Sequence, residues 1–571
     1  MRNILCVVGF LSATFSTSVI AQDAGALLRD REQSPDVRLP DQDLDGDDQL
    51  EPDQRPINTQ NGPTVLVETF TFTGQPNLLT VDQQQALASR IEGQSVSFAT
   101  IRALADEANA MLRQNGHLLA QAVIPPQDIT DGTLTFEIQN GVLEGTEFEY
   151  QDDVRIRENL LSAFVNRFAG SETISRPGLE SALLRINDLP GVSARSRLAP
   201  GNTPGSSRLI VSVEEEPLFS GALFADNFGS PSTGRAQGHA QLALSDLTGS
   251  ADFTSIGFSY SEGQRYVSAN FAIPLGASGL GLSASYGYLD YENIDAVGQA
   301  AGLNGEAHYG TVGLSWQAVR SRQTNLRFDI GLNGKALTDD SLAGQLSDKR
   351  SWSGSLAATA DTRDSFLGGG FSQLSVAWTY GDLDLSRNFG SEFADALGLR
   401  TQGDFHRFNV DALRLQALPA NFSLLLRASG QWASKNLDSS ETFSLGGPYG
   451  VRGWPVGEGR GDMGLLGTAE LRYDVPGFDL GALQFSAFLD AGRIRINKNS
   501  FGMPSFNACG CNSYSLSSAG LGLNWRHDRF TLSASWAHGL GSNPGRSIVD
   551  GTNVDGENDR QQFWITGSVR F

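Results

Sequence analysis

The chain has 571 residues, of which 64 are acidic and 42 basic, so its formal net charge is −22. This balance argues against a nucleic-acid-binding protein, because such proteins carry a basic surface that contacts phosphates. Glycine (65 residues) and phenylalanine (32) are abundant, whereas cysteine (3) and methionine (4) are rare. Together with the absence of long apolar runs, this composition indicates many β-strands.

Residues 1–21 have the three parts of a secretory signal peptide. Arg2 supplies the positive start, an apolar run covers Ile4–Leu11, and small residues end at Ala21. The alternative, an ordinary buried helix, fits the N-terminal position and the small residues less well. The segment is too short to span a bilayer. No later stretch resembles a transmembrane helix, so a membrane location would require a closed β-barrel.

Residues 22–63 are polar, acidic and interrupted by prolines, a composition that cannot bury a core and predicts a flexible linker. Alternating carboxylates from Asp41 to Asp47 match the first half of a calcium-binding loop, but Pro52 stands where the closing carboxylate is required. We therefore favour a solvated linker over a calcium site. Near the start of the linker, residues 24–33 have the pattern of a short amphipathic helix, which would be marginally stable in isolation.

Residues 64–141 and 142–216 form two similar small modules with the predicted order β-α-α-β-β. In the first, Val65–Phe72 predicts a strand and Phe98–Gln114 a helix, with Ser97 as its N-cap and Asn115-Gly116 at its C-terminal end. The apolar stripe of this helix is expected to comprise Phe98, Ile101, Leu104, Ala105, Ala108, Met111 and Leu112. The strands Leu118–Ile124 and Thr133–Gln139 follow.

The second module repeats this order. Its predicted strands lie at Thr146–Tyr150, Val192–Leu198 and Arg208–Glu214, and its predicted helices carry Leu160, Leu161, Phe164, Val165, Phe168, Leu179, Leu183 and Ile186. Small sheets of this kind have exposed edges, which accept an extended peptide as an additional strand. The candidate capture residues are Leu118, Ala120, Ala122 and Ile124. The modules would serve equally well as structural spacers, and these residues alone do not decide between the two.

Residues 217–571 consist of short segments in which apolar and polar residues alternate, with turns or loops between them. Val312, Leu314 and Trp316 alternate with small or polar neighbours, and the chain ends on a similar stripe at Phe571. This alternation suits a barrel with a lipid-facing exterior and a wet interior, although a soluble sandwich gives a similar pattern. The length, the C-terminal aromatic and about sixteen candidate strands favour the barrel.

Two stretches in this region combine glycine, aromatic and charged residues. The first is a glycine-rich loop that ends in Val451, Arg452, Gly453 and Trp454. The second is the strand segment Phe488–Gly492, whose alternation places Phe488 and Asp490 on one face and Phe485, Ala487 and Leu489 on the other. If the first face is the barrel interior, Arg452 is the natural partner of Asp490. The alternative is that Arg452 is one interior charge among many.

Further motifs accompany these two stretches: Ala120–Gln127 with Gly132, Asn140-Gly141, Ile186–Val192, and Asp226–Gly229 with Thr233-Gly234. With them, nearly the whole mature chain resembles the outer-membrane transporters of two-partner secretion, the haemolysin and filamentous-haemagglutinin exporters of the barrel-assembly superfamily. Trp454 stands where that family more often has Tyr or Phe, and His117 where it often has Tyr. Neither departure removes the arginine–carboxylate pair.

The resemblance implies a mainly β protein: a transmembrane barrel of about sixteen strands after two periplasmic POTRA-like modules. It also implies type V secretion without nucleotide hydrolysis. The modules would capture an unfolded partner of the adhesin or haemolysin class by its N-terminal secretion domain, and the partner would pass through the barrel to the cell surface. The family places a helix in the pore as a plug, which corresponds here to residues 24–33. The implied surroundings are outer-membrane lipid and, during biogenesis, the barrel-assembly machinery.

Other functions remain to be separated from export. A factor that assembles other outer-membrane barrels would be expected to have more modules and no pore helix, and a passive channel would leave the modules without a role. No pattern indicates an enzyme, a cofactor or a metal site. Cys509 and Cys511 lie in a long loop after the Asp490 strand. In an oxidising compartment they favour a local disulfide over a two-ligand metal site.

Overall fold

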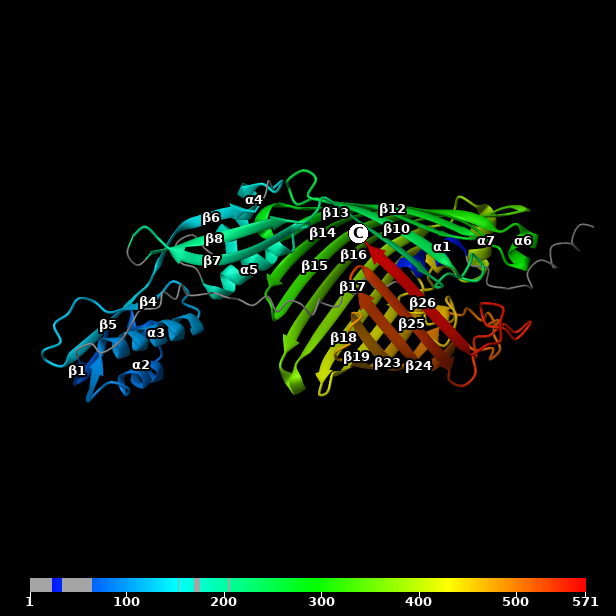
Figure 1. The fold of residues 1–571 in the computed structure, drawn as a ribbon. Coiled ribbons are helices and arrows are strands. Elements are labelled where there is room, and N and C mark those ends of the chain that lie inside the picture. The colour runs from blue at the N-terminus through cyan, green and yellow to red at the C-terminus, as the bar shows by residue number, and fades with distance from the viewer. Residues whose placement is uncertain (1–22, 33–63, 152–153, 169–174, 204–205) are drawn as a thin grey trace, which may run out of the picture.

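The computed structural model describes residues 23–32, 64–151, 154–168, 175–203 and 206–571. It consists of two small modules in line at one end of a closed β-barrel, with one helix inside the barrel (Figure 1). The predicted signal peptide at 1–21, most of the predicted linker and the partial calcium motif lie outside the described residues. No helix in the described part of the chain is both long and apolar enough to cross a membrane.

The first module has a three-stranded sheet in the order β2-β5-β4 and a two-stranded pair β1-β3. Its elements are β1 (Thr64–Val67), β2 (Thr69–Gly74), η1 (Pro76–Leu78), α2 (Val81–Ala88), β3 (Gln94–Ser97), α3 (Phe98–Gln114), β4 (Gln121–Val123) and β5 (Thr133–Gln139). Helix α3 has the bounds that the sequence predicts. It starts where the Ser97 hydroxyl accepts a hydrogen bond from the Thr100 amide, and it ends before Gly116, whose φ of +92° suits glycine.

Three predictions for this module were wrong in detail. Val65–Phe72 is two strands, not one, because Val67 and Phe70 are both buried, and residues three apart cannot share a face of one continuous strand. Phe98, expected in the apolar stripe of α3, is exposed at the start of the helix. The strand predicted at Leu118–Ile124 is only Gln121–Val123, because Leu118 and Leu119 instead pack into the core of the second module.

The second module has a sheet in the order β6-β8-β7 and two helices. Its elements are β6 (Val142–Tyr150), α4 (Glu158–Phe168), α5 (Arg176–Asn187), β7 (Val192–Pro200) and β8 (Ser206–Glu215). The module lies directly on the barrel turns that face it. Ala251, from the turn between the second and third barrel strands, is part of its core. Arg320, the last residue of the barrel strand Asn304–Arg320, makes two hydrogen bonds of 2.7 and 2.8 Å to Asp188.

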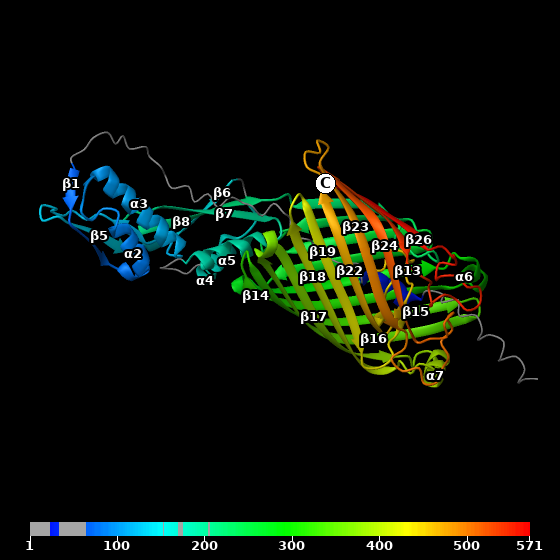
Figure 2. The same cartoon turned by 90° about the horizontal axis from the view of Figure 1, so that it is seen from below.

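Sixteen antiparallel strands close the barrel, in agreement with the predicted number (Figures 1 and 2). They are β9 (Phe219–Asp226), β10 (Gln237–Ser245), β11 (Phe253–Ser261), β12 (Gln264–Pro274), β13 (Leu280–Glu292), β14 (Asn304–Arg320), β15 (Thr324–Ser341), β16 (Gly344–Asp364), β17 (Gly370–Asp384), β18 (Gly403–Leu418), β19 (Phe422–Ala433), β22 (Met463–Asp474), β23 (Ala482–Arg495), β24 (Ser513–His527), β25 (Phe530–Gly539) and β26 (Gln561–Arg570).

The barrel wall is apolar outside and polar inside. Val312, Leu314 and Trp316 on β14 are exposed on the outer face, as their alternation predicts. The last strand, β26, pairs with the first, β9, through five residue pairs from Thr566–Asp226 to Arg570–Ala222. At the barrel end away from the modules, the connections carry the helices α6 (Ala296–Ala301) and α7 (Phe389–Leu397) (Figure 2).

Candidate functional site

The long connection between β19 and β22, residues 434–462, folds back into the barrel; we call it the interior loop. It contains η4 (Ser439–Glu441), β20 (Phe443–Ser444) and β21 (Arg460–Gly461). A tight turn brings the Val451 amide to the Leu445 carbonyl, at 2.6 Å, and the Trp454 amide to the Val451 carbonyl, at 3.1 Å. Leu445, Val451 and Trp454 then pack with side chains of the wall, so the turn has a small apolar core of its own.

This turn points Arg452 at the wall strand β23. Its Nε and Nη2 each donate to Asp490, at 2.9 Å, and Nη1 donates to Glu470 of β22 at 2.8 Å. The guanidinium carbon lies 3.2 Å from the ring centroid of Phe488, so the cation also rests on an aromatic face. Alternation along β23 places Phe488 and Asp490 inside the barrel and leaves Leu489 exposed outside.

Asp490 is buried and has further partners. The hydroxyls of Thr468 and Ser518 donate to its oxygens at 3.0 and 3.2 Å, and the Arg452 amide donates at 3.2 Å. Because Asp490 accepts two bonds from the Arg452 guanidinium and one from the Arg452 amide, it fixes the position of the interior-loop backbone as well as that of the arginine side chain. The arrangement locks the interior loop to the wall through a buried, charge-assisted contact.

The predicted glycines are positions of close approach. A Cβ at Gly453 would lie 2.6 Å from the Gly539 amide nitrogen and 2.7 Å from the Ser518 Cβ. A Cβ at Gly492 would meet the Leu445 side chain at 2.5 Å. Trp454 fills the space next to Gly539, and its indole N–H donates to the Ser517 carbonyl at 3.1 Å. The glycines therefore let the loop lie directly against the wall.

Helix α1 (Ala24–Glu32) lies inside the barrel and corresponds to the helix predicted over residues 24–33 (Figure 2). Leu27 and Leu28 pack against wall side chains, which are Leu289, Tyr291, Ala307 and Leu337. The first turn is fixed by polar contacts. The Ala24 amide donates to Asp339 of β15 at 2.9 Å, and Asp23 pairs with Lys349 of β16 at 2.9 Å.

The helix also contacts the interior loop along most of its length. Arg460 donates to both oxygens of Asp30 at 2.7 and 2.8 Å, and the Arg29 Nε donates to the Thr442 carbonyl at 3.0 Å. Gly25 is the position of closest approach, because a Cβ there would lie 2.6 Å from the Ser439 Oγ. The helix is thus held between the wall and the loop that Arg452 locks.

Glu441 of η4 is the charge centre of this contact. It lies 3.1 Å from Lys335 and 2.9 Å from Arg407, both on the inner wall, and Lys335 also pairs with Glu32 of α1 at 3.0 Å. Burial would raise the pKa of Glu441, but Lys335 and Arg407 outweigh burial and lower the pKa to about 2. The carboxylate is therefore ionised at neutral pH, and the network keeps its charges.

This network was not predicted from the sequence. Lys335 and Asp339 on β15, and Lys349 on β16, point to the barrel interior, on the face opposite the outward Leu332 and Leu356. Inward-facing charges in an alternating strand were the available signal. Their partners on α1 and the loop could not be found from spacing, because they are at least 89 residues away.

The candidate capture residues are mostly not available at the surface. Leu118 is buried in the core of the second module, Ala120 and Ala122 are buried in the core of the first, and Ile124 is partly buried. The Ala122 amide donates to the Asn109 side chain at 2.6 Å. Side-chain contact with a partner at Leu118, Ala120 or Ala122 is thus excluded in this fold, because these apolar side chains complete two module cores.

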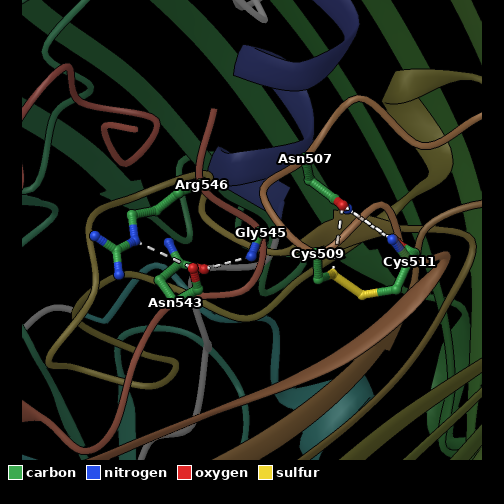
Figure 3. Close-up of a disulfide and its surroundings, with 6 residues drawn as sticks. All are labelled: Asn507, Cys509, Cys511, Asn543, Gly545 and Arg546. Carbon is green, nitrogen blue, oxygen red and sulfur yellow. Dashed lines mark hydrogen bonds between the residues drawn. A yellow bond between two sulfur atoms is a disulfide. The ribbon is translucent and has the colours of Figure 1, made fainter. Parts of the chain in front are cut away.

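Cys509 and Cys511 form a disulfide in the loop between β23 and β24. Figure 3 shows Asn507 beside it; the Asn507 side chain donates to the Cys511 carbonyl at 2.9 Å and accepts from the Cys511 amide at 3.1 Å. The Ala508 amide donates to the Arg546 carbonyl at 2.8 Å, which joins this loop to the one between β25 and β26. Among the described residues, no cluster of three or more His, Cys, Asp or Glu side chains could hold a metal ion.

Comparisons with known proteins agree with this architecture. The model of the family "Haemolysin secretion/activation protein ShlB/FhaC/HecB" matches residues 205–525, and that of the ShlB-type POTRA domain matches residues 67–141. The heme/hemopexin transporter protein HuxB of Haemophilus influenzae is 28% identical over 493 residues, which are 85% of this chain and 83% of HuxB.

Two solved structures show the same fold. CdiB from Escherichia coli superposes with a TM-score of 0.64 at 20% identity, covering 91% of this chain and 93% of CdiB. BamA from Haemophilus ducreyi, lacking POTRA domains 1–3, superposes with a TM-score of 0.54 at 14% identity, covering 89% of this chain and all of that structure. At these identities the two likenesses establish the fold alone.

Proposed function

The chain belongs to the haemolysin secretion/activation protein family ShlB/FhaC/HecB, whose members are outer-membrane transporters of two-partner secretion, and we propose how it carries its partner. The two modules bind one unfolded secreted polypeptide in the periplasm. Helix α1 then leaves the barrel, and the polypeptide passes through the vacated lumen to the cell surface. The observation that carries this proposal is the helix itself, seated in the lumen by reversible polar contacts.

Capture would use backbone edges. The outermost strands of the two module sheets are β2 and β4 in the first and β6 and β7 in the second. An extended polypeptide adds to such an edge through main-chain hydrogen bonds, which require no particular partner sequence. The sequence predicts the same kind of capture, at an edge that carries Leu118, Ala120, Ala122 and Ile124. Of these, Ala122 lies on the edge strand β4, and its side chain is buried.

The energy for passage would come from the partner. Folding of a domain outside the membrane releases about 5–15 kcal/mol, and a folded partner cannot return through the pore. Neither step requires a nucleotide. The cargo is proposed to be a large surface or secreted protein of the adhesin or haemolysin class, delivered with an N-terminal secretion domain.

The export test compares cells with and without this transporter. We expect one large polypeptide to reach the surface or medium only when the intact chain is present. The proposal is wrong if deletion leaves the surface and medium proteins unchanged but depletes many outer-membrane barrels, since that result identifies an assembly factor.

Conductance of the purified barrel in planar bilayers tests the role of α1. Deleting residues 22–34 should raise the single-channel conductance severalfold, because the helix and its ion pairs no longer occupy the lumen. A matched control replaces Asp128 by Asn. The side chain of this exposed residue of the first module accepts a hydrogen bond from the nearby Thr130 amide, and its replacement should leave conductance unchanged. Equal conductance with and without residues 22–34 would contradict a plugging role.

A further inference from the structure

Helix α7, on the connection between β17 and β18, has its polar side inward and its apolar side outward. Phe389, Phe393 and Leu397 are 78%, 56% and 70% exposed, at a spacing of four residues that aligns them along one face. Glu392 and Asp395 are instead partly buried and bonded within the connection, to Gln402 and Thr401. An isolated surface helix would have the opposite orientation.

The structure holds this helix firmly in that orientation. The Asn388 side chain caps it by accepting from the Ser391 amide at 3.0 Å and donates to the Gln345 carbonyl of β16 at 3.0 Å. Arg387 pairs with Asp348 of β16 at 3.1 Å. The contacts at the helix cap and at β16 therefore hold the apolar face of α7 outward.

A second apolar group adjoins the C-terminal end of α7. Phe501, Met503 and Phe506 are exposed in the β23–β24 loop, the loop that contains the disulfide. The Arg400 guanidinium lies 4.5 Å from the Phe501 ring centroid, and a Cβ at Gly398 would lie 3.8 Å from the Met503 Sδ. We call the six side chains together the outer apolar surface: Phe389, Phe393, Leu397, Phe501, Met503 and Phe506.

This surface is continuous with the interior loop. The buried side chain of Asn436, at the start of that loop, donates to the Leu399 carbonyl at 2.7 Å and to the Asn499 carbonyl at 2.8 Å. Asn436 thus connects the interior loop to the α7 connection and to the β23–β24 loop, which carry the outer apolar surface. The surface therefore borders the mouth of the lumen, on the side of the membrane where a partner emerges.

Membrane lipid is a poor occupant for this surface. Outward-facing aromatic residues, including Trp352, Trp378 and Tyr380, mark the lipid interface on β16 and β17. Beyond them, toward α7, the same faces carry charges: Asp382 stands opposite Asp404, and Asp384 opposite Arg350. This charged row separates the helix from the acyl chains. Helix α7 also has two acidic and no basic residues, whereas helices that bind anionic membranes are basic.

We propose that the outer apolar surface docks an apolar segment of the exported partner as it emerges from the barrel. The inference rests on the proposed export function and adds a second contact to it, outside the membrane. Exposed apolar patches that are rimmed by polar residues mark sites of interaction. A partner that is still unfolded offers apolar side chains, which the Phe389–Phe393–Leu397 stripe would cover.

The test uses the intact transporter in cells and the polypeptide whose export depends on it. A photoreactive amino acid is placed at Phe393 or Phe506, and at the exposed Val297 of α6 as control. We expect adducts with the exported polypeptide at the first two positions. When the photoreactive amino acid is at Phe506, replacing Phe389, Phe393 and Leu397 by serine should lower the adduct about tenfold. Val297→Ser should leave it unchanged.

Each other result overturns the docking proposal. Adducts with lipopolysaccharide identify a lipid contact, adducts with a second copy of this chain identify a dimer interface, and equal adducts at Val297 indicate unspecific proximity. An unchanged adduct in the triple serine variant also contradicts docking on α7. If export proceeds in any of these cases, only docking is wrong; if no polypeptide depends on the transporter, the export function is wrong as well.

Discussion

Arg452 bonds to two carboxylates and rests on one aromatic ring, so its replacement tests the interior loop at the scale of a single residue. Arg452→Ala leaves Asp490 buried without its cation, a change that costs about 3–5 kcal/mol. We expect a folded barrel whose interior loop becomes sensitive to protease and whose export falls at least about tenfold. Export by Arg452→Lys should fall between that of the original chain and that of Arg452→Ala, because lysine keeps the charge and loses the two-bond geometry.

The matched control is Arg197→Ala in the second module. Arg197 pairs with Glu149 at 2.8 Å, but both side chains are about half exposed, and such pairs contribute little to stability. Export and protease resistance should be unchanged. If Arg452→Ala behaves like this control, the arginine is one interior charge among many and the lock does not exist.

At this scale the sequence predicted one contact well and others not at all. The period-two alternation of residues 485–490 was sufficient to place Asp490 on the interior face, opposite Arg452. The sequence pattern gave no indication that residue 25 must be glycine, a requirement that arises because Ser439 lies against it. Such close approaches depend on how two distant segments meet, and spacing within either segment does not contain that information.

The seating of α1 is a property of a whole element, and acid should weaken it. Burial would raise the pKa of Asp23, but Lys349 and the Ser439 hydroxyl outweigh burial and lower the pKa to about 2. Because the pKa of Asp23 is lowered when the helix is seated, its carboxylate stabilises the seated helix at every pH above about 4. That contribution, about 2 kcal/mol, is lost as pH falls from about 4 to about 2. We expect channel openings to become more frequent over this range.

Asp23→Asn identifies the group responsible. The variant should show frequent openings already at neutral pH and a flatter response to acid. Burial raises the pKa of Asp30 despite Arg460, so protonation of Asp30 by acid would not unseat the helix as protonation of Asp23 would. The acid response of the unmodified chain alone therefore does not show which carboxylate is responsible. An Asp23→Asn barrel with the closed state and acid response of the original chain would show that this pair does not hold the helix.

The predicted bounds of helices and strands were right where the sequence pattern was long and wrong where it was short. The 17 residues of α3 have a cap, a stripe and a C-terminal glycine, and the helix has the predicted bounds. Residues 118–124 alternate over only a few positions, so a strand and a buried coil could not be distinguished. The coil formed because Leu118 and Leu119 are needed in the neighbouring core.

At the scale of the molecule, the second module contacts the barrel through several hydrogen bonds, including those of Arg155 to Asp246, Arg157 to Thr248 and Arg322 to Glu180. Among these contacts is the Arg320–Asp188 ion pair, which has two bonds. Arg320→Asp should let the module move, because two aspartates then face each other. The distance between a spin label on β6 and one on the β15–β16 turn should become broadly distributed. Adding Asp188→Arg should restore the narrow distribution; a narrow distribution in Arg320→Asp itself would show that Ala251 and the other turn contacts suffice.

The number of strands was predictable, because each crossing of the wall repeats the same alternation. The docking of the module was not, since the residues that make it stand in the connection 246–252 and at the end of β14, where no alternation indicates a partner. Overall topology and local contacts thus differ in how strongly the sequence encodes them.

The pairing of β26 with β9 has a consequence for biogenesis. It joins residues 222–226 to residues 566–570, so the barrel closes through a contact that spans almost its whole sequence. Contacts of such high contact order form late, because the entropy of a long loop must be lost first. A nascent chain that has not yet received its final strand has two open edges and no closed wall. The wall therefore closes only once β26 is in place, since β26 is the strand that covers the open edge of β9.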